Sequence, residues 1–253
     1  MSALLDVSDL SKRFGGLHAV RNVSFSIAPG EIVGILGPNG AGKTTLYNLL
    51  TGFIPPDSGT ILFKGRSLRG LAPYRIAGLG ISRTFQLCRP FVGMTVLENV
   101  VVGGLGAHGE SRNDLDARAL ELLDQVGLAG KAVLPVEALS YGDQRRLEIA
   151  RALAAKPSLL LLDEPFAGLG SGEIADLSAL IRKVHSEQGL TVMLIEHKLH
   201  EFMRLVGRVI ALDFGEVIAE GVPEYIVNHP AVVEAYIGRG NEQEQEQEQA
   251  DAA

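Results

Sequence analysis

A run of apolar residues that ends in a glycine-rich turn constrains the fold more than any other feature of the chain. Residues 31–36 are Glu-Ile-Val-Gly-Ile-Leu, and residues 37–45 continue as Gly-Pro-Asn-Gly-Ala-Gly-Lys-Thr-Thr. The spacing G-x-x-x-x-G-K-T directly after a buried strand is typical of a loop that holds phosphate groups and then opens a helix. A glycine-rich turn that merely contains a lysine would not need the preceding strand. We therefore expect a strand–loop–helix unit that binds a nucleoside triphosphate.

Different residues of this loop are expected to bind different parts of the nucleotide. The glycines allow backbone N–H groups to surround phosphate oxygens, and the helix dipole adds to that attraction. Lys43 is long enough to reach the β- and γ-phosphates, and the Thr44 hydroxyl is a candidate Mg²⁺ ligand. The predicted nucleotide-binding residues of this segment are Gly37, Pro38, Asn39, Gly40, Ala41, Gly42, Lys43, Thr44 and Thr45.

The composition is that of an ordinary soluble globular protein. The chain has 253 residues, of which 46% are hydrophobic and 21% charged. No apolar stretch approaches the roughly 20 residues that cross a bilayer, and the start, Met1 to Asp6, lacks the pattern of a signal peptide. Cys88 is the single cysteine, so no internal disulfide forms and a reducing compartment fits. We interpret Cys88 as a structural residue rather than a nucleophile.

The negative charge is concentrated at the C-terminus. The net charge is -7, but five of the 30 acidic residues lie in residues 241–253, which contain no lysine or arginine. The rest of the chain is nearly neutral and lacks the basic footprint of a nucleic-acid-binding protein. Residues 241–249 are Asn followed by alternating Glu and Gln without one apolar side chain, so we predict a disordered tail.

The hydrophobic pattern changes twice along the chain. Strand patterns and one helix dominate the first part, with strands expected at residues 4–7, 20–27, 31–36 and 60–63 and a helix at 43–50. From about 90 to 157 the pattern is helical, with helices expected at 114–126 and 144–156. Strands and helices then alternate, with strands at 158–162, 191–195, 208–212 and 216–219, a helix around 174–184 and two short helices up to Tyr236. The alternation predicts an α/β fold with a parallel sheet.

An acidic pair and a polar helix start add chemistry to the phosphate loop. Asp163 and Glu164 follow the apolar run 158–162, at the strand end where α/β sheets bind ligands. There Asp163 is placed to hold the water shell of Mg²⁺ and Glu164 to polarise an attacking water. Ser140 and Gly142 open a helix and offer donors to an anion. Taken alone, the acidic pair is also compatible with a helix cap, and Ser140 with a plain N-cap.

Together these segments resemble the ATP-binding cassette (ABC) ATPases over roughly residues 4–237. The resemblance implies that Phe14 stacks on adenine and that Gln86 senses Mg²⁺ and the γ-phosphate. It also implies that Ser140 and Gly142 act on ATP bound to a partner subunit. Lys43, Glu164 and His197 would be catalytic, and the Mg²⁺ ligands would be Thr44, Gln86 and, through water, Asp163.

The family fold is expected within residues 1–240. It consists of a P-loop NTPase core with a mostly parallel sheet, an N-terminal antiparallel β subdomain and an α-helical signature subdomain inserted at about 88–157. Residues 241–253 form the acidic tail beyond it. Three positions depart from the common family pattern. Tyr141 and Asp143 stand in the signature where Gly and Gln are usual, and Gly170 stands where Asp is usual.

Longer segments narrow the resemblance to one subfamily. Residues 83–86 (Arg-Thr-Phe-Gln), 141–153, 163–169, 194–197 and 234–238 are similar to the ATP-binding subunits of bacterial branched-chain amino acid importers. Transport of an amide, urea or aromatic acid remains open at this stage. A lipid or lipopolysaccharide exporter cassette and a non-transport soluble ABC ATPase are further alternatives.

The subfamily resemblance implies a set of partners and a location. The partners would be a second, paralogous ATPase subunit, two membrane permease subunits and, indirectly, a solute-binding protein, with no nucleic acid. The chain would lie at the cytoplasmic face of the inner membrane. A permease helix would enter a groove after Gln86, and the candidate lining residues are Leu87, Phe91, Met94 and Val96. These apolar residues are equally compatible with the core of the helical insertion.

Overall fold

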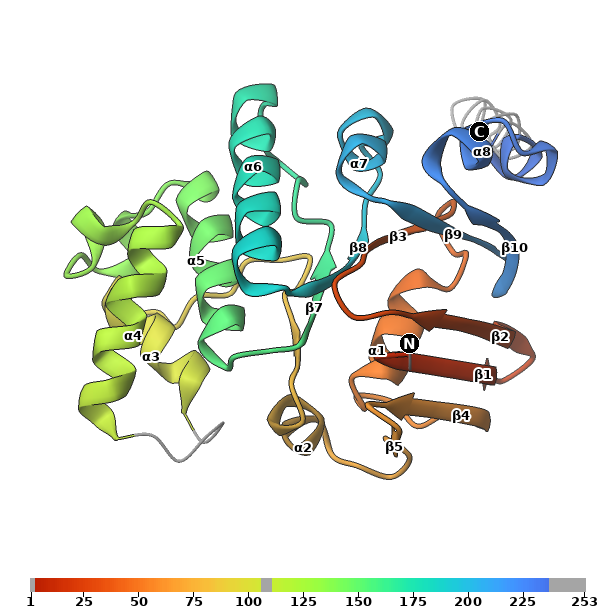
Figure 1. The fold of residues 1–253 in the computed structure, drawn as a ribbon, viewed down its shortest axis with the longest axis horizontal. Coiled ribbons are helices and arrows are strands. Elements are labelled where there is room, and N and C mark those ends of the chain that lie inside the picture. The colour runs from red at the N-terminus through yellow and green to blue at the C-terminus, as the bar shows by residue number, and fades with distance from the viewer. Residues whose placement is uncertain (1–2, 106–110, 237–253) are drawn as a thin grey trace, which may run out of the picture.

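The computed structural model describes residues 3–105 and 111–236 (Figure 1). Within these residues the strands form two sheets, and a group of helices lies to one side of them (Figure 1). The predicted tail at 241–253 lies outside the described residues. In the described part of the chain, no helix combines the length and apolar character that a membrane crossing requires.

The smaller sheet is antiparallel and built from the N-terminal part of the chain. Its order is β2-β1-β4-β5, and Leu5 of β1 pairs with Ile27 of β2 on one side and Phe63 of β4 on the other. Its strands are β1 (Leu5–Phe14), β2 (Leu17–Ile27), β4 (Ser58–Phe63) and β5 (Arg66–Ser67). β1 is longer than predicted because irregular pairing carries it past Asp9, which has a φ of 51°. The predicted antiparallel subdomain is confirmed.

The larger sheet is mostly parallel. Its order is β10-β9-β3-β8-β7-β6, and only the hairpin of β9 and β10 is antiparallel among the described pairings. Its strands are β3 (Ile32–Leu36), β6 (Ile81–Arg83), β7 (Leu159–Asp163), β8 (Thr191–Ile195), β9 (Arg208–Asp213) and β10 (Glu216–Gly221). Every residue of β7 and β8 is buried, which explains their unbroken apolar sequences.

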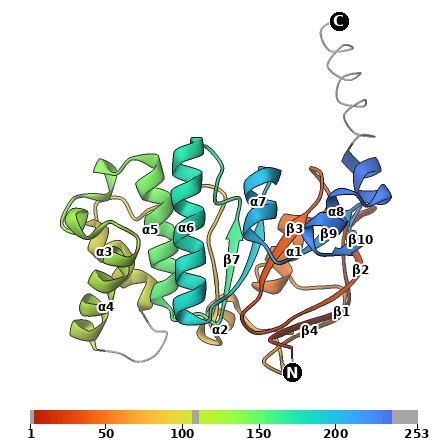
Figure 2. The ribbon, with the colours of Figure 1, turned by 45° about the horizontal axis from the view of Figure 1, so that its top comes forward.

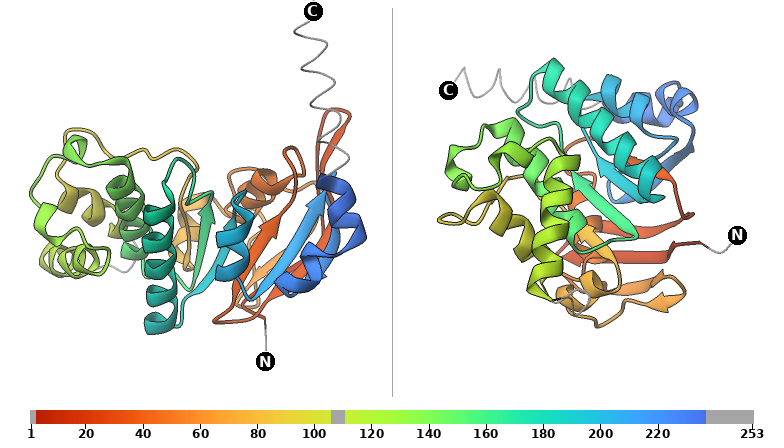
Figure 3. Two further views of the ribbon diagram at one scale, coloured as in Figure 1. Left: turned by 90° about the horizontal axis from the view of Figure 1, so that it is seen from above. Right: turned by 60° about the vertical axis from the view of Figure 1, so that its left-hand side comes forward.

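Helix α1 (Lys43–Leu50) joins the two sheets. Its buried side chains Leu46, Tyr47 and Leu50 share one hydrophobic core with β1 and β3. On the other face of the large sheet, buried side chains of α5 (Tyr141–Ala154) and α6 (Ser171–Gln188) share a second core with β7, and the two helices lie on the same side of the molecule in Figure 3. The remaining helices of this part are α2 (Pro73–Gly78), α7 (Leu199–Leu205) and α8 (Pro223–Val227), and α8 lies beside β9 and β10 (Figure 2).

The helical insertion contains more structure than the sequence pattern indicated. Besides α5 it holds α3 (Val96–Gly104), α4 (Arg112–Gln125) and 3-10 turns at Ala129–Lys131 and Val136–Ala138. α3 was not predicted, because its valines favour strands. A capping box between Thr95 and Glu98 starts this helix and burial of its apolar face stabilises it. Val96 is fully buried in this core, so of the two interpretations left open for it the core of the helical insertion is the correct one.

Candidate functional site

The phosphate loop has a shape that only glycine permits at two positions. Gly42 has a φ of 101°, and a Cβ there would lie 2.2 Å from the Ala19 carbonyl oxygen. A Cβ on Gly37 would lie 2.3 Å from the Leu212 carbonyl oxygen. The neighbouring strands therefore approach the loop so closely that the two glycines of the sequence motif are required by packing.

Lys43 lies over this loop at the start of α1. Its side chain is buried, and Nζ donates hydrogen bonds to the carbonyl oxygens of Gly37 (2.6 Å) and Pro38 (2.9 Å). The first turn of α1 contains no acidic residue, and Thr44 is exposed there. A helix start with a positive dipole end, a lysine ammonium and an exposed hydroxyl is suited to an anion with an attached cation.

Gln86, Glu164 and His197 come together, although 111 positions of sequence separate the outer two. Gln86 Nε2 donates to Glu164 Oε2 at 2.9 Å, and His197 Nε2 lies 3.0 Å from Glu164 Oε1. The Glu164 side chain is 17% exposed, so it remains open to a small molecule such as water. Its φ of 49° is costly for a residue other than glycine, and such conformations cluster at functional sites.

Asp163 ends β7 beside this group and is paired with an arginine. Its Oδ2 lies 2.6 Å from Arg83 Nη2, and both side chains are 5% exposed. The described residues contain no cluster of three or more His, Cys, Asp or Glu side chains that would enclose a metal ion. The hydroxyl of Thr44, the amide oxygen of Gln86 and, through water, the carboxylate of Asp163 are oxygen donors of the kind that Mg²⁺ accepts, since this ion usually keeps several water ligands beside a few protein and phosphate oxygens.

Glu196 is a buried carboxylate that the sequence analysis missed. Its Oε1 accepts from the Phe166 N–H at 2.6 Å, and its Oε2 accepts from the N–H groups of His197 (3.0 Å) and Lys198 (3.3 Å). Burial raises the pKa of this carboxyl above its usual range, and the three backbone hydrogen bonds oppose that shift. Glu196 thus fixes the loops that carry Glu164 and His197. Its position directly after a buried strand matches that of Glu164 after β7, and this was a usable signal.

The signature residues lie apart from the phosphate loop, as the separation of α5 from α1 in Figure 1 shows. Ser140 is the N-cap of α5, and its Oγ accepts from the Asp143 N–H at 3.2 Å. With Gly142 and Glu173 it lines a cavity of about 100 Å³. The chain therefore does not bring Ser140 and Gly142 to its own phosphate loop, which leaves them available to another molecule.

The unusual signature residues have structural partners. Asp143 forms an ion pair with Lys131. Burial raises the pKa of Asp143, but hydrogen bonds from Lys131 and Ser140 outweigh burial, so the net shift is downward. Tyr141 is uncharged, and its hydroxyl accepts a hydrogen bond from Arg145 Nη2 at 2.8 Å. Lys131 therefore compensates the extra negative charge that the sequence introduces beside the signature.

Arginine side chains of α5 hold the segment at 85–91. Arg145 donates to the carbonyl oxygens of Phe85 (3.2 Å) and Gln86 (2.6 Å), and Arg151 donates to that of Arg89 (2.9 Å). Cys88 Sγ donates to Glu148 Oε2 at 3.1 Å. Burial and the Glu148 charge raise the pKa of Cys88 to about 12, which agrees with a structural role.

Phe14 lies at the end of β1 and is half exposed. Lys12 Nζ lies 5.7 Å from the centre of its ring, within reach of a cation–π interaction. The ring is accessible for stacking, but no described contact joins it to residues 37–45. The other three candidate residues for the permease groove are exposed, namely Leu87, Phe91 and Met94.

Comparison with known proteins agrees with this geometry. The family model described as "ABC transporter" matches residues 20–167, and the model described as "Branched-chain amino acid ATP-binding cassette transporter" matches residues 216–241. The chain is 43% identical over 249 residues to the high-affinity branched-chain amino acid transport ATP-binding protein LivG of Escherichia coli K12, with 93% of this chain and 98% of LivG covered. It is 41% identical to BraF of Pseudomonas aeruginosa over the same shares of both chains.

Solved structures show the same fold. The ADP conformation of MJ1267, an ATP-binding cassette of an ABC transporter, superposes with a TM-score of 0.85 at 31% identity, covering 94% of this chain and 100% of MJ1267. A nucleotide-free ATP-binding cassette from an ABC transporter gives a TM-score of 0.84 at 30% identity, covering 93% of this chain and 99% of that chain.

The fold and the loop define a P-loop nucleotide-binding cassette. The chain belongs to the ABC transporter family, and the recognition drawn from its motifs is confirmed. The predicted fold class and ATPase activity are confirmed with it. Family membership implies a nucleotide ligand, membrane permease partners and a place at a membrane.

Proposed function

We propose that the chain is the ATP-hydrolysing subunit of a bacterial importer for branched-chain amino acids. The observation that carries the proposal is the Glu164 carboxylate, held between Gln86 and His197 in a chain 43% identical to LivG. The match of residues 216–241 to the branched-chain amino acid model supports the solute class. LivG and BraF are named as ATP-binding proteins of branched-chain amino acid transport, which supports the same assignment.

In this proposal ATP binds across the phosphate loop. Residues 37–45 hold the phosphates, Lys43 exchanges its loop carbonyls for phosphate oxygens, and the exposed Phe14 ring stacks on adenine. Thr44, Gln86 and, through water, Asp163 would hold Mg²⁺, which would neutralise charge on the phosphate oxygens. The expected nucleotide site thus combines a side chain of β1, the phosphate loop with the first turn of α1, the segment after β6 and the end of β7.

Hydrolysis is phosphoryl transfer to water. Glu164 accepts a proton from the water as the water oxygen bonds to the γ-phosphorus, and the bond to the β,γ-bridging oxygen breaks to release ADP and phosphate. Gln86 and His197 each contact one oxygen of Glu164, so they orient its carboxylate toward that water. His197 is 40% exposed, so its ring also remains accessible to a γ-phosphate oxygen.

The exposed signature supports pairing with a second cassette. We assign Ser140 and Gly142 to ATP held by a paralogous ATPase subunit, so that two chains close over two nucleotides. Two permease subunits and a solute-binding protein complete the transporter at the cytoplasmic face of the inner membrane. Within this chain we assign residues 1–240 to the ATPase domain, with the helical subdomain at about 88–157 and the acidic tail at 241–253.

Affinity purification tests this assignment. The full chain would be tagged in its native cell, the membranes solubilised gently, and the co-purifying proteins identified by mass spectrometry. We expect two permease subunits and a second cassette in stoichiometric amounts. A chain that leaves the membrane fraction without any permease partner would contradict the transport function.

A further inference from the structure

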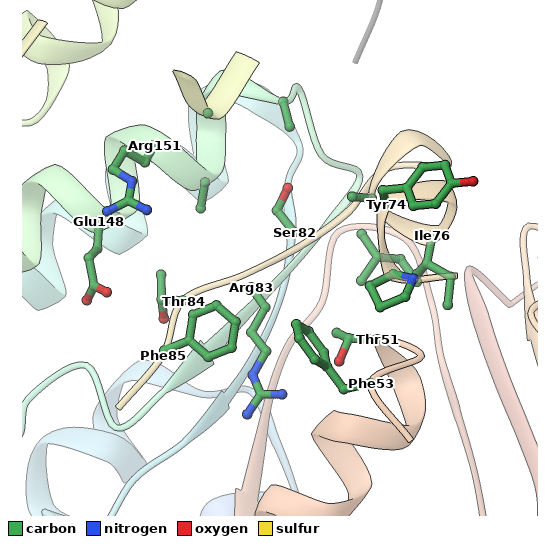
Figure 4. Close-up of a pocket in the computed structure, with 16 residues that line it drawn as sticks. Thr51, Phe53, Tyr74, Ile76, Ser82, Arg83, Thr84, Phe85, Glu148 and Arg151 are labelled. Carbon is green, nitrogen blue, oxygen red and sulfur yellow. The ribbon is translucent and has the colours of Figure 1, made fainter. Parts of the chain in front are cut away.

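A groove between the core and the helical insertion has an aromatic wall. The cavity has a volume of about 330 Å³ and is lined by residues of α2, β6 and α5, among them Tyr74, Glu148 and Arg151 (Figure 4). Phe53 and Phe85 meet edge to face with ring centres 5.8 Å apart. Their exposures of 54% and 46% are high for phenylalanine, so these rings form an accessible apolar wall.

Arg83 connects this wall to the acidic end of β7. Its guanidinium lies 5.0 Å from the centre of the Phe85 ring, and its side chain runs beside Phe85 and Phe53 in Figure 4. At its other end Nη2 contacts Asp163 Oδ2 at 2.6 Å, and Nη1 contacts Asn48 Oδ1 at 2.7 Å. A single planar group therefore touches the groove wall, helix α1 and Asp163.

The connection is rigid on both sides. Arg83 and Asp163 are each 5% exposed, and a buried ion pair contributes little net stability because of the desolvation that it costs. Its stronger effect is geometric, since the guanidinium fixes one carboxylate oxygen in a set direction. The backbone adds a second link, because the Asp163 N–H donates to Thr84 Oγ1 at 3.3 Å. Arg83 and Thr84 thus each hold Asp163, one at its carboxylate and the other at its backbone N–H.

We propose that Arg83 is a positioning residue that orients Asp163 for the metal ion and couples this orientation to the groove through the Phe85 ring. The inference rests on the proposed function, in which Asp163 holds the metal of the bound nucleotide. Because Arg83 contacts Oδ2 of Asp163, the other carboxylate oxygen, Oδ1, is the one that faces the water shell of the metal ion. A change in the position of Phe85 moves the guanidinium and with it the carboxylate.

The test measures metal affinity rather than turnover. Mn²⁺ binding to the full chain with a non-hydrolysable ATP analogue would be followed by electron paramagnetic resonance. Arg83→Lys keeps the charge but cannot contact Asn48 and Asp163 together, so Mn²⁺ affinity should fall by about tenfold. Affinity for the metal-free analogue should stay the same. A purely structural role would change the unfolding midpoint without changing Mn²⁺ affinity.

Two further variants test the contribution of the groove wall separately from the Arg83–Asp163 ion pair. Phe85→Leu removes the ring over Arg83, whereas Phe53→Leu removes the other ring of the same wall, which meets Phe85 edge to face and has no described cation–π contact with Arg83. We expect about threefold weaker Mn²⁺ binding for Phe85→Leu and no change for Phe53→Leu. Equal effects of the two variants would contradict the coupling.

A control distinguishes this inference from the proposed function. If Asp163→Asn weakens Mn²⁺ binding and Arg83→Lys does not, the role of Arg83 is wrong and the metal assignment stands. If neither variant changes Mn²⁺ binding, both are wrong. Should Arg83→Lys fail to fold, Asn48→Ala releases the same guanidinium, and the same direction of change is expected.

Discussion

The loop at 37–45 and the segment at 83–91 both belong to the proposed nucleotide site, but different forces hold them in place. The loop owes its shape to its own residues, because Gly37 and Gly42 allow neighbouring strands to approach it closely. The segment at 83–91 owes its shape to side chains far away in sequence, chiefly Arg145 and Arg151 of α5.

This difference determines what each region is able to do. A loop fixed by local geometry keeps its shape when distant elements move, which suits the binding of phosphates. A segment tied to α5 follows any displacement of that helix, and α5 begins at Ser140 and Tyr141. A contact that moves the signature end of α5 would therefore also move this segment and, with it, Gln86. The following predictions test this division, from the largest expected effect to the smallest.

Glu164→Gln should give the largest loss. A glutamine side chain cannot accept a proton from the attacking water, so the hydrolysis rate should fall by about 10³-fold while ATP affinity is retained. Initial rates of phosphate release and equilibrium nucleotide binding check the two parts. Glu187→Gln, an exposed change on α6, is the matched control and should keep its activity. Full turnover by Glu164→Gln would contradict the role of this residue.

Lys43→Ala should remove most of the nucleotide affinity. Truncating one partner of a buried charge pair costs about 3 kcal/mol, which corresponds to roughly 100-fold in dissociation constant. Isothermal titration with an ATP analogue measures the change. Lys64→Ala is the control, because Lys64 is exposed and contacts Ser158 rather than the loop. Equal affinities of the Lys43 and Lys64 variants would refute the phosphate-loop assignment.

Gly42→Ala should destabilise the fold and not only the site. The φ of 101° and the close Ala19 carbonyl oxygen together should lower the free energy of unfolding by about 2–3 kcal/mol. Gly172→Ala in α6 has open space around its Cβ and should be neutral or stabilising by up to about 1 kcal/mol. Denaturant midpoints for the two variants would show whether the loop geometry is as strictly determined as the structure indicates.

Cys88 reports on the packing of the segment at 83–91. Its pKa of about 12 lies above the usual value, so only a small thiolate fraction exists at pH 8. Alkylation should be slow there and rise about tenfold per pH unit up to the pKa. Glu148→Gln removes the neighbouring negative charge and should lower the pKa, so the thiol should react faster. An alkylation rate equal to that of a small-molecule thiol in the unaltered chain would contradict the described packing.

The sequence predicted the parts of the fold that local patterns determine. The buried strands around Leu160 and Val192 were clear from their apolar runs, and the phosphate loop from its glycines. Helices α3 and α7 were missed, since caps and tertiary burial form them against weak local preferences.

The candidate site divides in the same way. The motifs placed Gln86, Glu164 and His197 in one site, and the structure brings them within hydrogen-bond distance. Arg83 and Glu196 were not singled out, because their roles depend on which strands become neighbours. The place of Val96 stayed open between groove and core because an apolar residue near a loop gives no indication of which way it faces.

ATP-dependent uptake of radiolabelled leucine tests the central claim most directly. Proteoliposomes would contain the co-purified transporter, with ATP supplied on the side of this chain and the solute-binding protein on the other. The account predicts that leucine accumulates with the unaltered chain and that accumulation stops with Glu164→Gln. ATP hydrolysis without leucine uptake by the unaltered chain, or full uptake with Glu164→Gln, would contradict it.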